Sequence, residues 1–333
     1  MFDKRFEMRY NFFILNTGKH MIISTGIRTD IVNHYSDWLF ERFREGFVLT
    51  RNPLFPNKVT RYRLSPDAVD AVVFCSKNYQ PVLNRISSIT AKYRTFFHYT
   101  ITAYGKDIEP NMPSQKARIA TLIELSSLVG RERLMWRFLP VFFTEEYPPE
   151  RVLDTFDMLA EQIAPHVCGC IFGYVEAFFN LRTRMPELIP LDSETKRAFA
   201  GRIAALAKKH VLPMQTCGIH NTYEEYGIAS RGCYTLDMIG TANNCAFRNV
   251  KHTGNNRGCL CITCRDIGWY DSCPNLCLYC NANHSVAEVK ENVRRHDPHS
   301  PLLIGLPRED DEISEGIQTS FLRDERQISL FDL

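Results

Sequence analysis

The most constraining feature of this sequence is a cluster of cysteines between residues 259 and 283. The cluster holds six of the twelve cysteines of the chain, and Cys273, Cys277 and Cys280 follow one another with C-x3-C-x2-C spacing. Three thiolates on one short loop match three irons of a [4Fe–4S] cube, whereas a fully ligated cluster takes four cysteines. The loop therefore predicts a metal site with one open coordination position, as in catalytic rather than structural metal sites.

Two other interpretations of this loop are compatible with its composition. Structural zinc sites usually pair two C-x2-C units, and the three-then-two spacing fits that pattern poorly. A low-potential electron-transfer cluster would take a fourth cysteine from elsewhere in the chain. The loop alone does not separate these alternatives from a cluster with an open iron.

Composition places the chain among globular proteins of a reducing compartment. Its 333 residues are enough for one barrel-sized domain or two ordinary ones. The formal net charge of +2 gives no argument for a membrane or nucleic-acid partner, although nucleic acid is not excluded. The apolar run at residues 12–15 is too short for a signal peptide, and no run reaches the length of a membrane span. Nine of the twelve cysteines lie between Cys217 and Cys280, so we expect metal binding in the cytoplasm.

Short apolar runs alternate with amphipathic stretches through most of the chain. The apolar runs are residues 21–24, 71–75, 96–102, 134–138, 170–175 and 211–216. Helices are predicted between them, with Ser114 and Asp192 as N-caps and Pro149 as an opening residue. This alternation predicts an α/β fold with a parallel sheet, in the form of a full or partial TIM-like (β/α) barrel.

The same pattern suggests four segments. Residues 1–20 are expected to be an N-terminal extension, and residues 21–216 to supply the (β/α) barrel units. Periodicity weakens after residue 216, so residues 217–285 are predicted to form a cysteine-rich iron–sulfur region that completes the barrel with a last strand at 260–267. Residues 286–333 are expected to form a C-terminal helix and tail.

The cysteine loop resembles the signature of radical S-adenosylmethionine (radical SAM) enzymes, because an aromatic residue, Tyr279, precedes the last cysteine. In that superfamily the open iron of a [4Fe–4S] cluster chelates SAM, and an electron from the cluster cleaves SAM to a 5′-deoxyadenosyl radical. The resemblance implies an enzyme that needs SAM and a reductant such as a flavodoxin or ferredoxin, with an unknown substrate. The loop follows the first barrel strand in those enzymes and the last strand here. We therefore expect a circularly permuted barrel in which residues 260–267 lie beside residues 21–24.

Several segments also resemble a bacterial family, domain of unknown function family 1848, and the loop alone is similar to that of spore photoproduct lyases. The matching segments are residues 21–24, 28–30, 51–53, 104–111, 136–137, 266–268, 273–280 and 296–305. Cys217, Cys233, Cys259 and Cys261 match cysteines of the family. That match implies a second [4Fe–4S] cluster, with structural zinc or reduced, packed thiols as the alternatives.

Polar residues just past strand ends are the catalytic candidates of a (β/α) barrel. Arg28 and Asp30 follow the first strand. Arg28 can bind the SAM carboxylate with its guanidinium, whereas Asp30 can bind an amino group or a ribose hydroxyl, or simply cap the next helix. Lys77 follows the second strand and Arg137 lies near the end of the fourth. Tyr279 is a further cofactor-binding candidate by the resemblance.

Three functions are compatible with these patterns. The first is a radical SAM-like iron–sulfur enzyme. The second is a non-enzymatic iron–sulfur protein that transfers electrons or senses redox state, and the third is a zinc-stabilised binding module. In all three, Cys75, Cys168 and Cys170 are expected to be core residues because they lie in or beside apolar runs.

Overall fold

A computed structural model describes residues 22–176, 181–217, 222–248, 259–318 and 320–323, so the predicted extension at residues 1–20 lies outside the described residues. The strands of the main sheet are β1 (Ile22–Ser24), β4 (Ala71–Ser76), β5 (Thr95–Thr100), β6 (Leu134–Val141), β7 (Gly169–Tyr174), β8 (Met214–Cys217), β9 (Ala229–Arg231) and β10 (Arg265–Asp266). Their spatial order is β10-β1-β4-β5-β6-β7-β8-β9, and every neighbouring pair is parallel. The predicted α/β fold with a parallel sheet is confirmed.

The helices lie in the segments between the strands, and α5, α6 and α8 begin at the predicted cap or opening residue. They are α2 (Ile31–His34), α3 (Ser36–Glu45), α4 (Ser87–Thr90), α5 (Gln115–Val129), α6 (Pro149–Ile163), α7 (Leu181–Arg184), α8 (Ser193–Lys209), α9 (Leu236–Asn243) and α10 (Val286–Arg294). Ser114 caps α5 by accepting from the amide of Ala117 at 3.2 Å, and Asp192 caps α8 by accepting from Thr195 at 2.7 Å. Pro149 opens α6, where a missing N–H costs nothing.

The two faces of the sheet carry different apolar sets because successive strand side chains alternate. On the helix-covered face, Trp136 of β6 stacks on Phe156 of α6, with ring centroids 5.2 Å apart. On the opposite face, Val73 and Phe96 pack with residues from the cysteine-rich region, including Cys261. The cysteine-rich region therefore covers the sheet face that the main helices leave free.

The two edges of the main sheet are β9 and β10. The predicted neighbour of the first strand is confirmed, since β10 pairs with β1 through Ile23 with Arg265 and Ser24 with Asp266. Over the described residues the sheet stays open at these edges, and β10 is shorter than the predicted strand at 260–267. The segments next to the two edges nevertheless meet, because the amide of Ile262 donates to the carbonyl of Tyr234 at 3.1 Å.

A second, smaller sheet has the order β11-β3-β2. Its strands are β2 (Phe47–Arg51), β3 (Lys58–Arg63) and β11 (Glu312–Glu315). Arg51 forms an ion pair with the carboxylate of Asp311, which fixes the C-terminal segment against the β2–β3 hairpin. The tail therefore adds a strand to a hairpin formed early in the chain.

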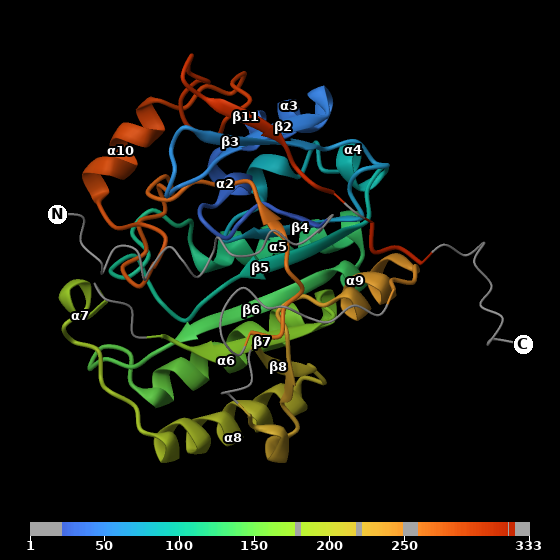
Figure 1. Ribbon diagram of the computed structural model, residues 1–333. Helices are drawn as coiled ribbons and strands as arrows, with labels where there is room; N and C mark the ends of the chain where they lie inside the picture. Colours follow the sequence, from blue (N-terminus) through green and yellow to red (C-terminus); the bar gives the residue numbers. More distant parts are fainter. Residues whose placement is uncertain (1–21, 177–180, 218–221, 249–258, 319, 324–333) are drawn as a thin grey trace, which may run out of the picture.

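The carboxyl ends of the parallel strands share one edge of the molecule. In Figure 1 the arrowhead of β6 points to the left, the side on which α7 and α10 also lie. Loops that follow β1, β4, β5 and β10 must open on this side because the strands are parallel. This is where (β/α) folds place their binding sites.

Candidate metal centres

The cysteine loop follows β10 and is closed by hydrogen bonds between its ends. The Asp271 carboxylate accepts from the backbone amides of His284 and Ser285, the latter at 2.9 Å. The side chain of Asn283 donates to the carbonyl of Cys273 at 2.7 Å and accepts from its amide at 3.3 Å. These contacts hold the three cysteines between them on a compact segment.

The three loop cysteines line one cavity of about 140 Å³. Cys273 and Cys277 are buried, and Cys280 is partly exposed. The rest of the lining comes from the carboxyl ends of strands and the loops that follow them. It includes the predicted site residues Arg28, Asp30, Lys77, Arg137 and Tyr279. The structure thus brings all the predicted catalytic and cofactor-binding residues to the cysteine loop.

The spacing of the loop thiols differs from that of a single-ion site. Among the residues that the structure describes, one group of three or more ligand atoms lies within 4.8 Å of one another, and it consists of Cys217, Cys259 and Cys261. The thiols of the 273–280 loop are therefore more widely spread than ligands that share one ion. Cysteines on an iron–sulfur cube bind different irons, with each bond directed outward, so wider spacing suits that cofactor.

Burial favours the protonated form of the Cys273 and Cys277 thiols. Burial raises the pKa of Cys277 to about 12, although the nearby ammonium of Lys77 acts in the opposite direction. Burial also raises the pKa of Cys273. Metal ligation must displace these protons, so metal binding at the loop releases protons and strengthens as the pH rises.

Asp30 links three parts of the site. Its Oδ1 accepts from the amide of Asn33 at 3.1 Å and from the hydroxyl of Ser76 at 2.6 Å. Its Oδ2 accepts from the amide of Lys77 at 3.0 Å and from the side chain of Asn275 at 3.1 Å. Asp30 is thus the N-cap of α2, and it also ties the cysteine loop to the end of β4.

Glu109 is a second carboxylate next to the loop that accepts four hydrogen bonds, as Asp30 does. Its Oε1 accepts from Lys77 Nζ at 2.8 Å, from Thr102 Oγ1 at 2.6 Å and from the Tyr279 hydroxyl at 2.5 Å. Its Oε2 accepts from Arg118 at 3.1 Å. Burial raises the pKa of Glu109, but Lys77 and Arg118 outweigh burial and hold the pKa below its ordinary value. Glu109 therefore carries a negative charge at neutral pH.

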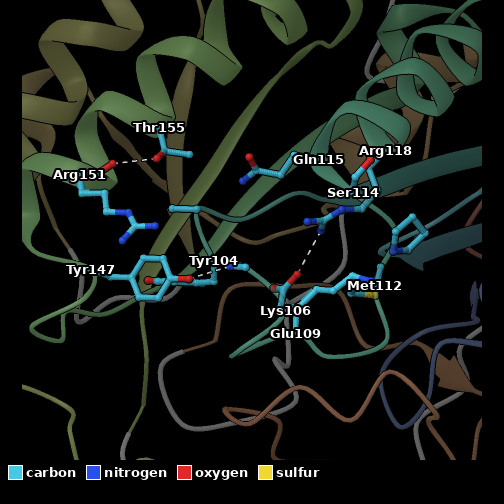
Figure 2. Close-up of a pocket in the computed structure, with 13 residues that line it drawn as sticks. Tyr104, Lys106, Glu109, Met112, Ser114, Gln115, Arg118, Tyr147, Arg151 and Thr155 are labelled. Atoms are coloured by element: carbon cyan, nitrogen blue, oxygen red, sulfur yellow. Dashed lines mark hydrogen bonds and ion pairs between the residues drawn. The ribbon is translucent and has the colours of Figure 1, made fainter.

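A larger polar cavity of about 310 Å³ lies on the other side of Glu109. Figure 2 shows its lining, with the Arg118 guanidinium directed at the Glu109 carboxylate. Lys106 and Arg151 add further positive charge to the lining. Because Lys77 lines the cysteine cavity and Glu109 lines this one, their ion pair stands between the two cavities.

Residues of β10 and of the loop that follows it orient the Arg28 side chain. Its Nε lies 3.8 Å from Asp266 Oδ2, and its guanidinium lies 5.3 Å from the ring centroid of Tyr270. Burial raises the pKa of Asp266, and Arg28 opposes that shift. The predicted pairing of β10 with β1 therefore also positions this cation at the cavity.

Cys75 departs from the expectation of a core residue. It is partly exposed, it lines the same cavity as the loop cysteines, and its sulfur accepts a hydrogen bond from Arg137 Nη1. Cys217 and Cys233 also lie near enough to Arg137 to interact with its charge when they are thiolates. Arg137 consequently lies between the loop cysteines and the second cysteine set.

The second cysteine set gathers where the two edges of the sheet meet. The sulfurs of Cys217 and Cys261 lie 3.7 Å apart. The amide of Cys233 donates to Cys261 Sγ at 3.0 Å, and the amide of Cys261 donates to Cys259 Sγ at 3.5 Å. This part of the chain can therefore bind a metal.

The family profile described as "Domain of unknown function (DUF1848)" matches residues 22–282, which is most of the chain. The chain belongs to this family. No curated protein matches this family member. One solved structure, an endoglucanase, resembles it with a TM-score of 0.24 and 9% identity, covering 67% of this chain and 90% of the other, and a likeness that weak carries no argument. Within the described part of this DUF1848 protein, no helix is long and apolar enough to cross a bilayer.

Sequence reasoning missed two residues of the site. Cys75 follows Ala71 and Val73 at alternate positions of β4. That alternation places Cys75 with them on the sheet face that the cysteine-rich region covers. Asn275 lies between two loop cysteines, and its polar amide is buried against Asp30. The alternation could have revealed Cys75, whereas the partner of Asn275 depends on tertiary structure.

Proposed function

We propose that this protein is an iron–sulfur enzyme of the radical SAM type. Cys273, Cys277 and Cys280 would hold a [4Fe–4S] cluster, and SAM would bind at the open iron. The observation that carries the proposal is the single cavity that these three cysteines share with Arg28 and Lys77 at the carboxyl ends of the strands. When bound, the cluster supplies the electron for reductive cleavage of SAM, and a flavodoxin or ferredoxin would supply that electron in turn.

The side chains around the cavity divide the remaining work. Arg28 presents a guanidinium suited to the SAM carboxylate. Asp30 has protein donors on both oxygens, so it acts by positioning the loop through Asn275 rather than by binding SAM. Lys77 and Arg118 keep Glu109 ionised, and the Tyr279 hydroxyl donates a further hydrogen bond to it beside the cluster.

We further propose that the fold is a permuted (β/α) barrel. The parallel pairing of β10 with β1 supports this proposal. The strand that leads into the cluster loop thus lies beside β1, although the loop comes more than 200 residues after β1 in the sequence. The hydrogen bond from Ile262 to Tyr234 supports closure between the segments beside β9 and β10. In this arrangement residues 217–285 complete the barrel begun by residues 21–216.

The test is electron paramagnetic resonance on anaerobically purified, dithionite-reduced protein, with and without SAM, together with iron and zinc analysis. We expect a [4Fe–4S]⁺ signal that changes shape when SAM is added. The signal should be lost in Cys277→Ala and kept in Cys245→Ser, which removes a cysteine outside both sets. A signal that SAM leaves unchanged, or a protein without iron at the loop, would contradict the proposal.

A second candidate function is favoured by Cys75. This thiol lines the cluster cavity and could supply a fourth ligand, which would make the site a closed electron-transfer centre. The same spectra distinguish the two, because Cys75→Ala would open a closed cluster to SAM. In the proposed enzyme, by contrast, SAM already changes the paramagnetic signal of the wild-type protein, which has Cys75.

A further inference from the structure

The second cysteine set has the geometry of a single-ion site. Cys217 ends β8, Cys233 follows β9, and Cys259 and Cys261 lie in the segment that leads into β10. The sulfurs of Cys217, Cys259 and Cys261 all lie within 4.8 Å of one another. The Cys233 sulfur lies outside this group, but the Cys233 side chain interacts with those of Cys217 and Cys261 and its amide donates to Cys261, so Cys233 is placed beside the three as a fourth ligand.

The distances distinguish one ion from a cluster. Zinc binds cysteine sulfur at about 2.3 Å in a tetrahedron, so two sulfurs on one zinc lie about 3.8 Å apart. The measured distance between the sulfurs of Cys217 and Cys261 is 3.7 Å. On a [4Fe–4S] cube each cysteine binds a different iron, and the sulfurs lie farther apart. On a [2Fe–2S] cluster each iron takes two cysteines, which does not place three sulfurs together.

The surroundings suit thiolates rather than packed thiols. Backbone amides donate to two of the sulfurs, from Cys233 to Cys261 and from Cys261 to Cys259. Such donors stabilise the anionic form of an acceptor. Four thiolates around Zn²⁺ leave a net charge of about −2, which needs compensation at a buried site. The Arg137 guanidinium provides a positive charge that interacts with Cys217 and Cys233.

We propose that Cys217, Cys233, Cys259 and Cys261 bind one structural zinc ion, rather than the second [4Fe–4S] cluster expected from the sequence. The ion joins β8 and the segment after β9 to the segment before β10. The ion therefore links the two edges of the main sheet and holds the cysteine-rich region against the sheet face that the helices leave free. This proposal does not depend on the chemistry of the 273–280 loop.

The experiment measures zinc and iron in full-length protein, purified anaerobically without added metal, and compares Cys261→Ser with Cys245→Ser. We expect about one zinc per chain in the wild type and in Cys245→Ser. In Cys261→Ser, zinc content should fall by about tenfold or more, while the iron content of the loop is kept. Cys277→Ala should show the reverse pattern, loss of iron with zinc retained, so failure of either metal assignment is recognised separately.

X-ray absorption at the zinc edge of the wild-type protein provides a test that does not need a folded variant. We expect four sulfur neighbours at about 2.3 Å and no metal neighbour close to the zinc. The proposal would be overturned if Cys261→Ser lost iron together with zinc. It would also be overturned if the wild-type protein contained no zinc and its four thiols were free.

Discussion

At the scale of single residues, the site depends on one buried carboxylate. Glu109 is 1% exposed, and its partners Lys77 and Tyr279 both line the cysteine cavity. Arg118, itself 2% exposed, holds the other oxygen. An ionised group at this depth is stable only with such partners, and each partner in turn needs the carboxylate. Glu109 therefore connects the cysteine cavity to the neighbouring polar cavity.

Glu109→Gln should destabilise the protein by about 3–5 kcal/mol at neutral pH, because it leaves the buried Arg118 and the partly buried Lys77 without their counter-charge. Urea unfolding measures this, with the exposed Glu124→Gln on α5 as a control that should change stability by less than about 0.5 kcal/mol. The pKa of Glu109 is lowered in the folded protein, so its contribution is complete above the unfolded pKa of about 4.3 and is lost as the pH falls through the folded value. The difference between variant and wild type should therefore shrink in acid; an equal difference at all pH values would contradict the ion-pair explanation.

At the scale of elements, the turn between β1 and α2 is shaped by its contact with β4. A Cβ on Gly26 would lie 2.0 Å from the backbone oxygen of Cys75, a distance that real atoms do not adopt. Gly26 thus lets the turn carrying Arg28 and Asp30 approach the end of β4. The positions of Arg28 and Asp30 are therefore set by the close approach to β4 and by the N-cap of α2.

Gly26→Ala should displace the β1–α2 turn and weaken the response of the cluster signal to SAM by about tenfold or more, because Arg28 moves with the turn. Titration of the paramagnetic signal with SAM measures this change. Gly173→Ala is the matched control, since a Cβ there meets no atom within 4 Å and the backbone is compatible with alanine. Equal SAM responses in the two variants would show that the turn does not position a SAM ligand.

At the scale of the whole molecule, the main sheet is parallel throughout and open at β9 and β10 in its described part. Edge strands expose unpaired backbone groups, and natural folds cover or join them. Here the segments beside the two edges meet through Ile262 and Tyr234, and the second cysteine set lies at the same place. Metal binding and closure of the molecule are therefore expected to be coupled.

Removal of zinc by a chelator should loosen this junction while the centre of the sheet stays folded. We expect amide hydrogen exchange to speed up by about tenfold or more in peptides covering β9 and β10, and to stay unchanged in β4 and β5. Mass spectrometry of the chelated and zinc-loaded protein measures the difference. Uniform acceleration over all strands, or no change at β9 and β10, would contradict a role of the metal in joining the edges.

Much of this architecture follows from local sequence. The strands at 71–76 and 95–100 are apolar and β-branched or aromatic, and α5 and α8 begin at side-chain caps, so period and capping predict them. The hairpin β2–β3 was missed because β3 carries three charged side chains and only two of its six residues are buried. β9 and β10 are two or three residues long, and their stability comes from neighbours rather than from their own composition.

The cysteine loop is the feature that sequence alone determined, because its three cysteines lie within eight residues and their spacing is set by local chain geometry. Sequence also singled out Arg28 and Lys77, which follow strand ends, and Arg137, which lies within β6 rather than at its end, and all three line the cavity of the loop cysteines. Only the tertiary structure decided that Cys75 joins the loop cavity, that Glu109 links Lys77 to Tyr279, and that Cys217 and Cys261 share one site. Those contacts join residues 32 positions apart or more, and packing of the whole sheet, rather than local preference, brings such residues together.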